Sequence, residues 1–175
     1  MTRIDTYSEY KSFVAELDLA DFLAHRDDLR RAWHCAGSLF HLSDWVYQAH
    51  AASINAGFTY VDDAGVTQRV TKAEHFATSL GQQFPEFQLI RGIANASKHF
   101  VLKPVPPGRI NPPGMPSHAA NTYVSGSAFQ ASAFQSNAFQ VGDVKLEAGH
   151  GDIEFAPLAQ TVIEMWNNLF VANGW

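Results

Sequence analysis

The sequence predicts a mainly α fold, a helical bundle with small β-hairpin excursions and a long Pro/Gly-rich loop. Apolar residues recur at intervals of three and four in several segments, as they do on the buried face of a helix. The alternation of strands and helices that builds a parallel sheet is absent. Six of the eight prolines fall between residues 104 and 116, where neither a helix nor a central strand is expected.

Two helices are expected in the first third of the chain. The first is short and amphipathic and ends within the LDLADF segment; its apolar stripe consists of Tyr7, Tyr10, Val14 and Leu17. The second runs from about residue 27 to residue 54, since Asp27 and Asp28 suit the positive N-terminus of a helix. Its expected apolar arc consists of Leu29, Trp33, Ala36, Phe40, Ser43 and Tyr47.

A small hairpin and two further helices follow. Residues 58–70 place an Asp-Ala-Gly turn between two β-prone runs, which is typical of a hairpin. A helix is expected from about residue 71, and another from Pro85, because proline suits the first position of a helix. These elements complete the first part of a single domain, whose helical core spans about residues 5–102 and 155–173.

Residues 103–152 are expected to form an irregular insertion. It contains three copies of Ala-Phe-Gln at a period of five between residues 128 and 140, and neither a helix nor a strand keeps such a period on one face. The copies superficially resemble a pentapeptide-repeat β-helix. An irregular excursion over the core or part of a dimer contact is the preferred interpretation.

The chain is expected to return through a short hairpin in VKLEAGHGDIEF and a final helix that opens at Pro157. The core-facing stripe of that helix consists of Leu158, Val162, Met165, Leu169 and Ala172. The bulky Trp175 at its end must pack into the fold or meet a partner. Trp33, Trp45 and Trp166 are interpreted as core anchors.

The composition restricts the class of protein. With 46% hydrophobic and 17% charged residues the chain is typical of a globular protein, and a net charge of -5 opposes a large non-specific nucleic-acid surface. The single cysteine, Cys35, cannot form an intramolecular disulfide, and the N-terminus lacks an apolar signal core, so a cytoplasmic location is expected. No apolar run reaches the roughly 20 residues of a membrane span. No cofactor is expected, because nucleotide loops, hydrolase elbows and metal-ligand spacings are absent.

The most informative segment is IRGIANASKHF, residues 90–100. On a helix, its polar residues occupy an arc of about 100° opposite an apolar face. The polar residues are Arg91, Asn95, Lys98 and His99, and the apolar ones are Leu89, Ile90, Ile93 and Phe100. Arginine and lysine can hold an anion, asparagine can orient it, and histidine can exchange a proton. The alternative is the ordinary solvated side of an amphipathic helix.

A second polar stripe lies on the long helix and consists of His34, His41, Asp44 and Gln48. His41 and Asp44 stand three residues apart and can form a hydrogen bond that fixes the imidazole tautomer. If the two helices pack together, Asp44 could face Lys98 or His99. A metal site formed by His41, Asp44 and His99 is an alternative, as is ordinary surface hydrogen bonding. Cys35 is expected to be a small core residue.

The segments HLSDW and LIRGIANASKHF, within residues 27–102, resemble a group of small bacterial helical proteins that is similar to the HEPN superfamily. The resemblance implies a compact helical fold, homodimers and, in active members, ribonuclease chemistry. It makes Arg91 the phosphate-binding arginine and His99 the histidine of the cut. Seven residues separate the two, where active members have four to six, and Gly92 replaces the usual polar neighbour.

Together these observations predict a homodimeric, HEPN-like protein that binds RNA or cleaves it without a metal. Arg91, Asn95, Lys98 and His99 form its expected site, and His41 and Asp44 support it. One alternative is a non-enzymatic protein–protein interaction module that uses the Pro-rich loop, the Ala-Phe-Gln copies and Trp175. Another is a small metal-binding helical protein.

Overall fold

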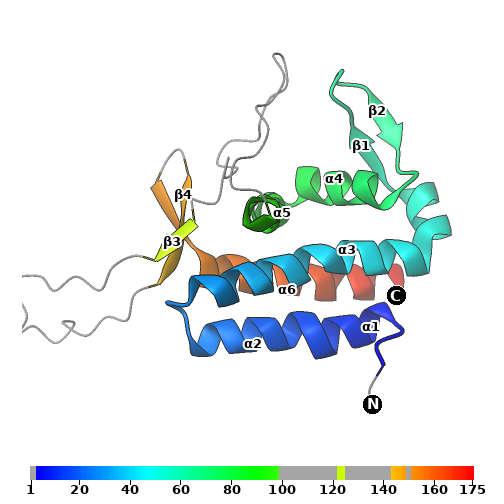
Figure 1. The fold of residues 1–175 in the computed structure, drawn as a ribbon. Coiled ribbons are helices and arrows are strands. Elements are labelled where there is room, and N and C mark those ends of the chain that lie inside the picture. The colour runs from blue at the N-terminus through cyan, green and yellow to red at the C-terminus, as the bar shows by residue number, and fades with distance from the viewer. Residues whose placement is uncertain (1–2, 99–121, 125–142, 149–150) are drawn as a thin grey trace, which may run out of the picture.

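The computed structural model describes residues 3–98, 122–124, 143–148 and 151–175, and it confirms the mainly α fold with small antiparallel hairpins (Figure 1). The described helices are α1 (Tyr7–Tyr10), the π-helix η1 (Lys11–Ala15), α2 (Glu16–Ala24), α3 (Leu29–Gly57), α4 (Ala73–Gln83), α5 (Pro85–Lys98) and α6 (Phe155–Asn173). None of them is long and apolar enough to cross a membrane. The Pro/Gly-rich loop and the Ala-Phe-Gln copies lie outside the described residues.

The helices stack in three layers (Figure 1). Helices α3 and α6 form the middle layer, α1 to α2 cover one side of it, and α4 and α5 cover the other. The buried residues of these helices and of strand β4 (Val144–Ala148) form one hydrophobic cluster. Because α3 is covered from two sides, its buried surface is wider than a single amphipathic face.

The N-terminal helical segment differs from its prediction in which residues it buries. The side chain of Leu17, expected in the core, is 57% exposed, whereas Ala15, Leu19 and Phe22 are buried. The cause is η1, whose π geometry holds one residue more than an α-helical turn. That extra residue changes the phase of the buried face by about 100°, the advance of one residue. A stripe extrapolated from Tyr7 therefore leaves the core after η1.

Helix α3 begins and ends close to its predicted limits. Asp28 caps its N-terminus by accepting hydrogen bonds from the backbone amides of Arg30 (2.9 Å) and Arg31 (3.2 Å). The helix bends at His50, whose backbone angles (φ −127°, ψ 24°) are not helical. Its buried residues are Ala32, Cys35, Ala36, Ser38, Leu39, Leu42, Ser43, Val46, Tyr47 and Ile54. Of the predicted arc, Ala36, Ser43 and Tyr47 are buried, and the other three residues are partly buried at the edge of this surface.

The first hairpin, β1 (Thr59–Val61) with β2 (Thr67–Arg69), confirms the prediction for residues 58–70. Asp62 stabilises the turn by accepting hydrogen bonds from the amides of Ala64 and Val66, and Gly65 adopts a left-handed conformation with φ 77°. Helix α5 begins at Pro85, as predicted.

The second sheet has three antiparallel strands, in the order β3 (Thr122–Val124), β4 and β5 (Gly151–Glu154). The β4–β5 pair confirms the predicted hairpin, but β3 was not predicted. Helix α6 begins at Phe155, two residues before Pro157. Proline fits there because the amides of the first turn have no partner within the helix.

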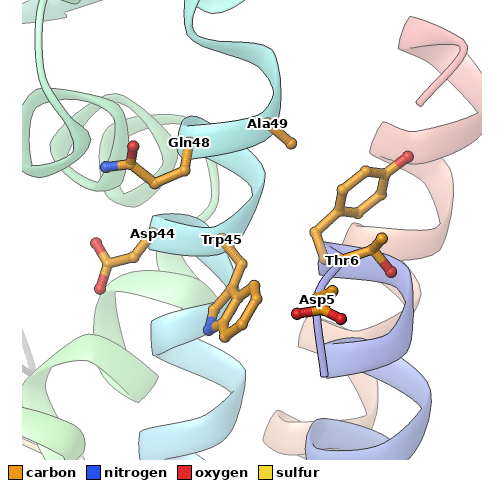
Figure 2. A pocket seen from close by; sticks show the side chains of 7 residues that line it. Asp5, Thr6, Asp44, Trp45, Gln48 and Ala49 are labelled. Atoms are coloured by element: carbon orange, nitrogen blue, oxygen red, sulfur yellow. The ribbon is translucent and has the colours of Figure 1, made fainter. Parts of the chain in front are cut away.

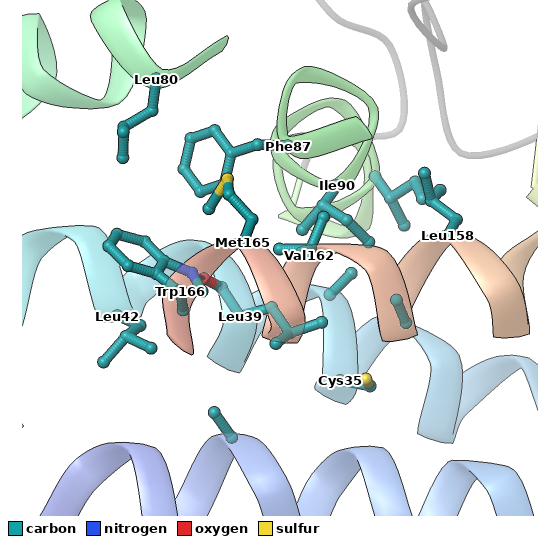
Figure 3. Close-up of a cluster of buried hydrophobic side chains, with 14 of the residues drawn as sticks. Cys35, Leu39, Leu42, Leu80, Phe87, Ile90, Leu158, Val162, Met165 and Trp166 are labelled. Carbon is teal, nitrogen blue, oxygen red and sulfur yellow. Dashed lines mark hydrogen bonds between the residues drawn. The ribbon is translucent and has the colours of Figure 1, made fainter. Parts of the chain in front are cut away.

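The four tryptophans occupy different environments. Trp166 is fully buried in the cluster of Figure 3, where its indole N–H donates to the carbonyl of Leu39 at 3.2 Å. Trp33 is partly buried and packs against the core cluster, whereas Trp45 is partly buried and is not among the residues of that cluster, so only its assignment as a core anchor is wrong. Trp175 packs within the fold, with its ring stacked on His50 at 5.1 Å.

Candidate functional site

The predicted polar face of α5 is described at two of its four positions. Arg91 and Asn95 are both partly buried, one turn apart, while Ile90 and Ile93 are buried on the other side of the helix, as expected. The backbone of α5 ends at Lys98, whose side chain lies outside the described part of the structure.

His99, the fourth residue of this face, also lies outside the described residues. Of the four residues in the predicted polar arc, the structure therefore describes the side chains of Arg91 and Asn95 only. The roles expected for Lys98 and His99 stay predictions.

Arg91 is oriented by helix α4. Its Nη1 donates a hydrogen bond to Oγ1 of Thr78 at 3.1 Å. Glu74, one turn before Thr78, has its pKa held below the usual range, first by the hydrogen bond and charge of Lys72 and to a smaller extent by the charge of Arg91. The guanidinium of Arg91 therefore lies where α4 and α5 meet, and the neutral hydroxyl of Thr78 is one of its hydrogen-bond partners.

On α3 the predicted His41–Asp44 pair is present. The distance from Nδ1 of His41 to Oδ2 of Asp44 is 3.1 Å, and the two side chains are 37% and 49% exposed. His34 and Gln48, the other members of the stripe, are exposed. A carboxylate bonded to Nδ1 favours the tautomer with the proton on that nitrogen and leaves Nε2 as the acceptor.

The two polar sets lie on helices that pack against each other. The α3–α5 contact includes the rings of Phe40 and Phe87, whose centroids are 6.2 Å apart, and His41 follows Phe40 directly on α3. Among the described contacts, Arg91 donates to Thr78 on α4, and His41 bonds Asp44 on its own helix. Thr78 was not expected from the sequence, because its contact with Arg91 depends on how α4 and α5 fold against each other.

The metal-site alternative finds no support among the described residues, which contain no group of three or more His, Cys, Asp or Glu side chains able to hold an ion. His41 and Asp44 supply two of the three ligands of the predicted site, and the third, His99, is outside this part of the chain. Cys35 is fully buried, and burial raises the pKa of its thiol, so it is a core residue as predicted.

A pocket of about 500 Å³ separates the start of α1 from α3 (Figure 2). It is lined by Asp5, Thr6, Tyr7, Asp44, Trp45, Gln48 and Ala49. One sequence pattern beside the pocket was not used in the prediction. Thr6 and Glu9 form a reciprocal capping box, the Thr-x-x-Glu pattern that marks a helix start, and this fixes the backbone on one side of the pocket.

Comparison of the chain with models of known protein families found no match, and comparisons with curated proteins and with solved structures found no significant similarity.

Proposed function

We propose that this chain is a HEPN-like protein that binds RNA through the polar face of α5 and cleaves it without a metal ion. In this proposal Arg91, Asn95 and Lys98 bind a backbone phosphate and His99 transfers a proton. His41 and Asp44 support the site from α3. The observation that carries the proposal is the orientation of the partly buried Arg91 by Thr78.

The contact with Thr78 suits phosphate binding for an electrostatic reason. A guanidinium presents its five N–H donors in one fixed plane, which matches the oxygens of a phosphate. The hydroxyl of Thr78 fixes that plane and leaves the positive charge intact. The nearby Glu74 already forms an ion pair with Lys72 at 2.8 Å, so its negative charge is shared.

Cleavage would follow from in-line attack by the ribose 2′-hydroxyl on the adjacent phosphorus. The bond from phosphorus to the 5′-oxygen breaks, which leaves a 2′,3′-cyclic phosphate on one product and a 5′-hydroxyl on the other. The proton leaves the 2′-oxygen and a proton is delivered to the 5′-oxygen, the exchange assigned to His99. The charge that develops on the phosphate is stabilised by Arg91 and Lys98.

RNA binding is tested by fluorescence anisotropy with a labelled single-stranded RNA at two salt concentrations. We expect Arg91→Ala to weaken binding about tenfold or more, because a hydrogen bond to a charged group contributes about 1.5–3 kcal/mol. The matched control is Arg69→Ala on the exposed strand β2, which removes the same charge away from α5. Equal weakening by both variants would overturn the α5 assignment.

Cleavage is tested on the same RNA in the presence of EDTA, with product ends identified by mass spectrometry. We expect cyclic phosphate ends from the unaltered protein and loss of cleavage in His99→Ala with RNA binding retained. RNA bound without any cleavage would reduce the proposal to an RNA-binding protein. Cleavage that EDTA abolishes would contradict the metal-independent mechanism.

A second candidate function is association through the outer face of the N-terminal helices. Phe13 and Leu17 lie one turn apart and are 53% and 57% exposed, so two large apolar side chains face solvent within one turn. Trp175, part of the interaction hypothesis, is partly buried and stacks on His50. We propose that a second copy of the chain covers Phe13 and Leu17. Light scattering should then show a dimer that Phe13→Glu converts to a monomer; a monomeric unaltered protein would refute it.

A further inference from the structure

We propose that the pocket between the start of α1 and helix α3 binds an organic cation through a quaternary ammonium group. Its volume of about 500 Å³ lies in the range of about 300–1,000 Å³ that is typical of small-molecule sites. Its lining combines two aromatic rings with two carboxylates, those of Tyr7, Trp45, Asp5 and Asp44. The proposal does not depend on RNA binding by α5.

Both aromatic rings of the lining are held in place by other rings. Trp45 stacks on Tyr10 with a centroid distance of 5.0 Å and an interplanar angle of 20°. Tyr7 makes edge contacts with His50 at 4.9 Å and with Phe170 at 5.3 Å. A cation that enters the pocket therefore meets aromatic surface whose position is already fixed, and tryptophan is the strongest aromatic partner for a cation.

The charged groups of the lining are both acidic, and in Figure 2 the side chain of Asp44 points away from Asp5. Figure 2 shows Asp5 on the segment that leads into α1 and Asp44 on α3, with Trp45 between them. Asp5 also pairs with Arg3 at 2.6 Å, but that arginine is 86% exposed, so the pair is weak and readily displaced. Asp44 is also bonded to His41, with 3.1 Å between Oδ2 and Nδ1.

Tyr10, the ring that stacks on Trp45, is partly buried close to two carboxylates. Its pKa is raised to about 12, first by burial and then by the negative charges of Asp18 and Asp44. The same charges that oppose a tyrosinate favour a cation beside it.

An organic cation fits the lining better than a metal ion does. The described residues contain no group of three ligands for a metal, whereas the pocket offers broad aromatic surface. A quaternary ammonium has no N–H donors and is recognised by aromatic faces and by long-range attraction to carboxylates. The same group occurs on free choline-type molecules and on trimethylated lysine side chains of peptides.

The first experiment is a titration of the full chain with choline, followed by two-dimensional NMR of the tryptophan indole N–H groups. The control ligand is 3,3-dimethyl-1-butanol, which has the same shape without the charge. We expect choline to shift the Trp45 signal with a dissociation constant of about 1 mM, which is within reach of a ligand of its size, and the alcohol to bind at least about tenfold more weakly. Equal binding of both, or no saturable shift with choline, would overturn the proposal.

Variants locate the site. Asp44→Asn should weaken choline binding about two- to fivefold, as expected for a partly exposed charge. The matched control is Asp27→Asn, which removes the same charge from an exposed position in the connection between α2 and α3. This connection lies at the end of the two helices that is far from α1 (Figure 1), so choline binding should stay unchanged. Trp45→Phe keeps an aromatic ring and should weaken binding less than Trp45→Leu. Equal effects of Asp44→Asn and Asp27→Asn would place the cation elsewhere.

A peptide that carries one trimethyllysine distinguishes the two sources of the ammonium group. Tighter binding of this peptide than of choline identifies a protein side chain as the ligand, and tighter binding of choline identifies a free choline-type molecule. The unmethylated peptide should bind more weakly than its methylated form, because the ammonium of lysine is more strongly hydrated. No preference for the methylated form would contradict recognition by the aromatic rings.

Discussion

Replacing Trp166 with phenylalanine tests how the core is held together. The indole is fully buried, lies edge-on to Phe87 with centroids 5.9 Å apart, and donates its N–H to the carbonyl of Leu39 at 3.2 Å. Trp166→Phe removes that hydrogen bond, a loss of about 1 kcal/mol. It also removes buried apolar surface comparable to two methylene groups, about 1.6 kcal/mol.

The free energy of unfolding should therefore fall by about 2.5 kcal/mol, which corresponds to a decrease in Tm of about 5–10 °C for a chain of this size. Urea unfolding followed by far-ultraviolet circular dichroism measures the change without depending on tryptophan fluorescence. Trp166→Ala should cost more, about 3–5 kcal/mol, because it leaves a larger cavity.

Trp33→Phe is the matched control. The indole nitrogen of Trp33 is buried and has no hydrogen-bond acceptor among the described residues. An unpaired buried donor costs about 1–3 kcal/mol, so its removal offsets the lost packing and the net change should stay within about 1 kcal/mol. If Trp33→Phe destabilises the protein as much as Trp166→Phe, the reasoning about these two indoles is wrong.

Three further predictions concern single groups. Between pH 10 and 12, the unaltered protein should lose more stability than Tyr10→Phe does. In the folded state the pKa of Tyr10 is raised to about 12, above its ordinary value of 10. The contribution of the protonated phenol to the free energy of unfolding is therefore complete below pH 10 and is lost as the pH rises toward 12. Urea unfolding across this pH range measures the loss. Gly174→Ala should destabilise by about 1 kcal/mol in thermal unfolding, since Gly174 ends α6 with φ 66°, whereas Gly57→Ala, at a helical position with open space, should be neutral or stabilising. Cys35 should react with a thiol reagent only at the rate of unfolding, because it is fully buried and its thiol pKa is raised; a fast reaction in native buffer would contradict its placement.

The features predicted correctly from the sequence depend on neighbours along the chain. The start of α5 at Pro85 follows from the chemistry of one residue, and the start of α3 follows from the acidic residues before it. The His41–Asp44 bond was expected because residues three apart share a helix face. Such contacts form wherever the helix forms, so no tertiary information is needed.

The features missed depend on how distant segments meet. The bond from Arg91 to Thr78 needs α4 and α5 to fold against each other, and the pocket needs α1 to lie beside α3. Strand β3 was missed because its partner lies about twenty residues further along the chain. The exposure of Leu17 was missed because a change from α to π geometry leaves no periodic signal in four or five residues.

The π-helix η1 has an evolutionary consequence for the pocket. Because of it, Tyr7 and Tyr10 before η1 face the aromatic side chains of α3, while Leu19 and Phe22 after η1 face the core. A one-codon deletion within residues 11–15 would restore a regular helix and turn the tyrosines by about 100° without changing the sequence of α2. Such a deletion would therefore change which side chains the start of α1 presents to the pocket, while the rest of the sequence of the bundle stays the same.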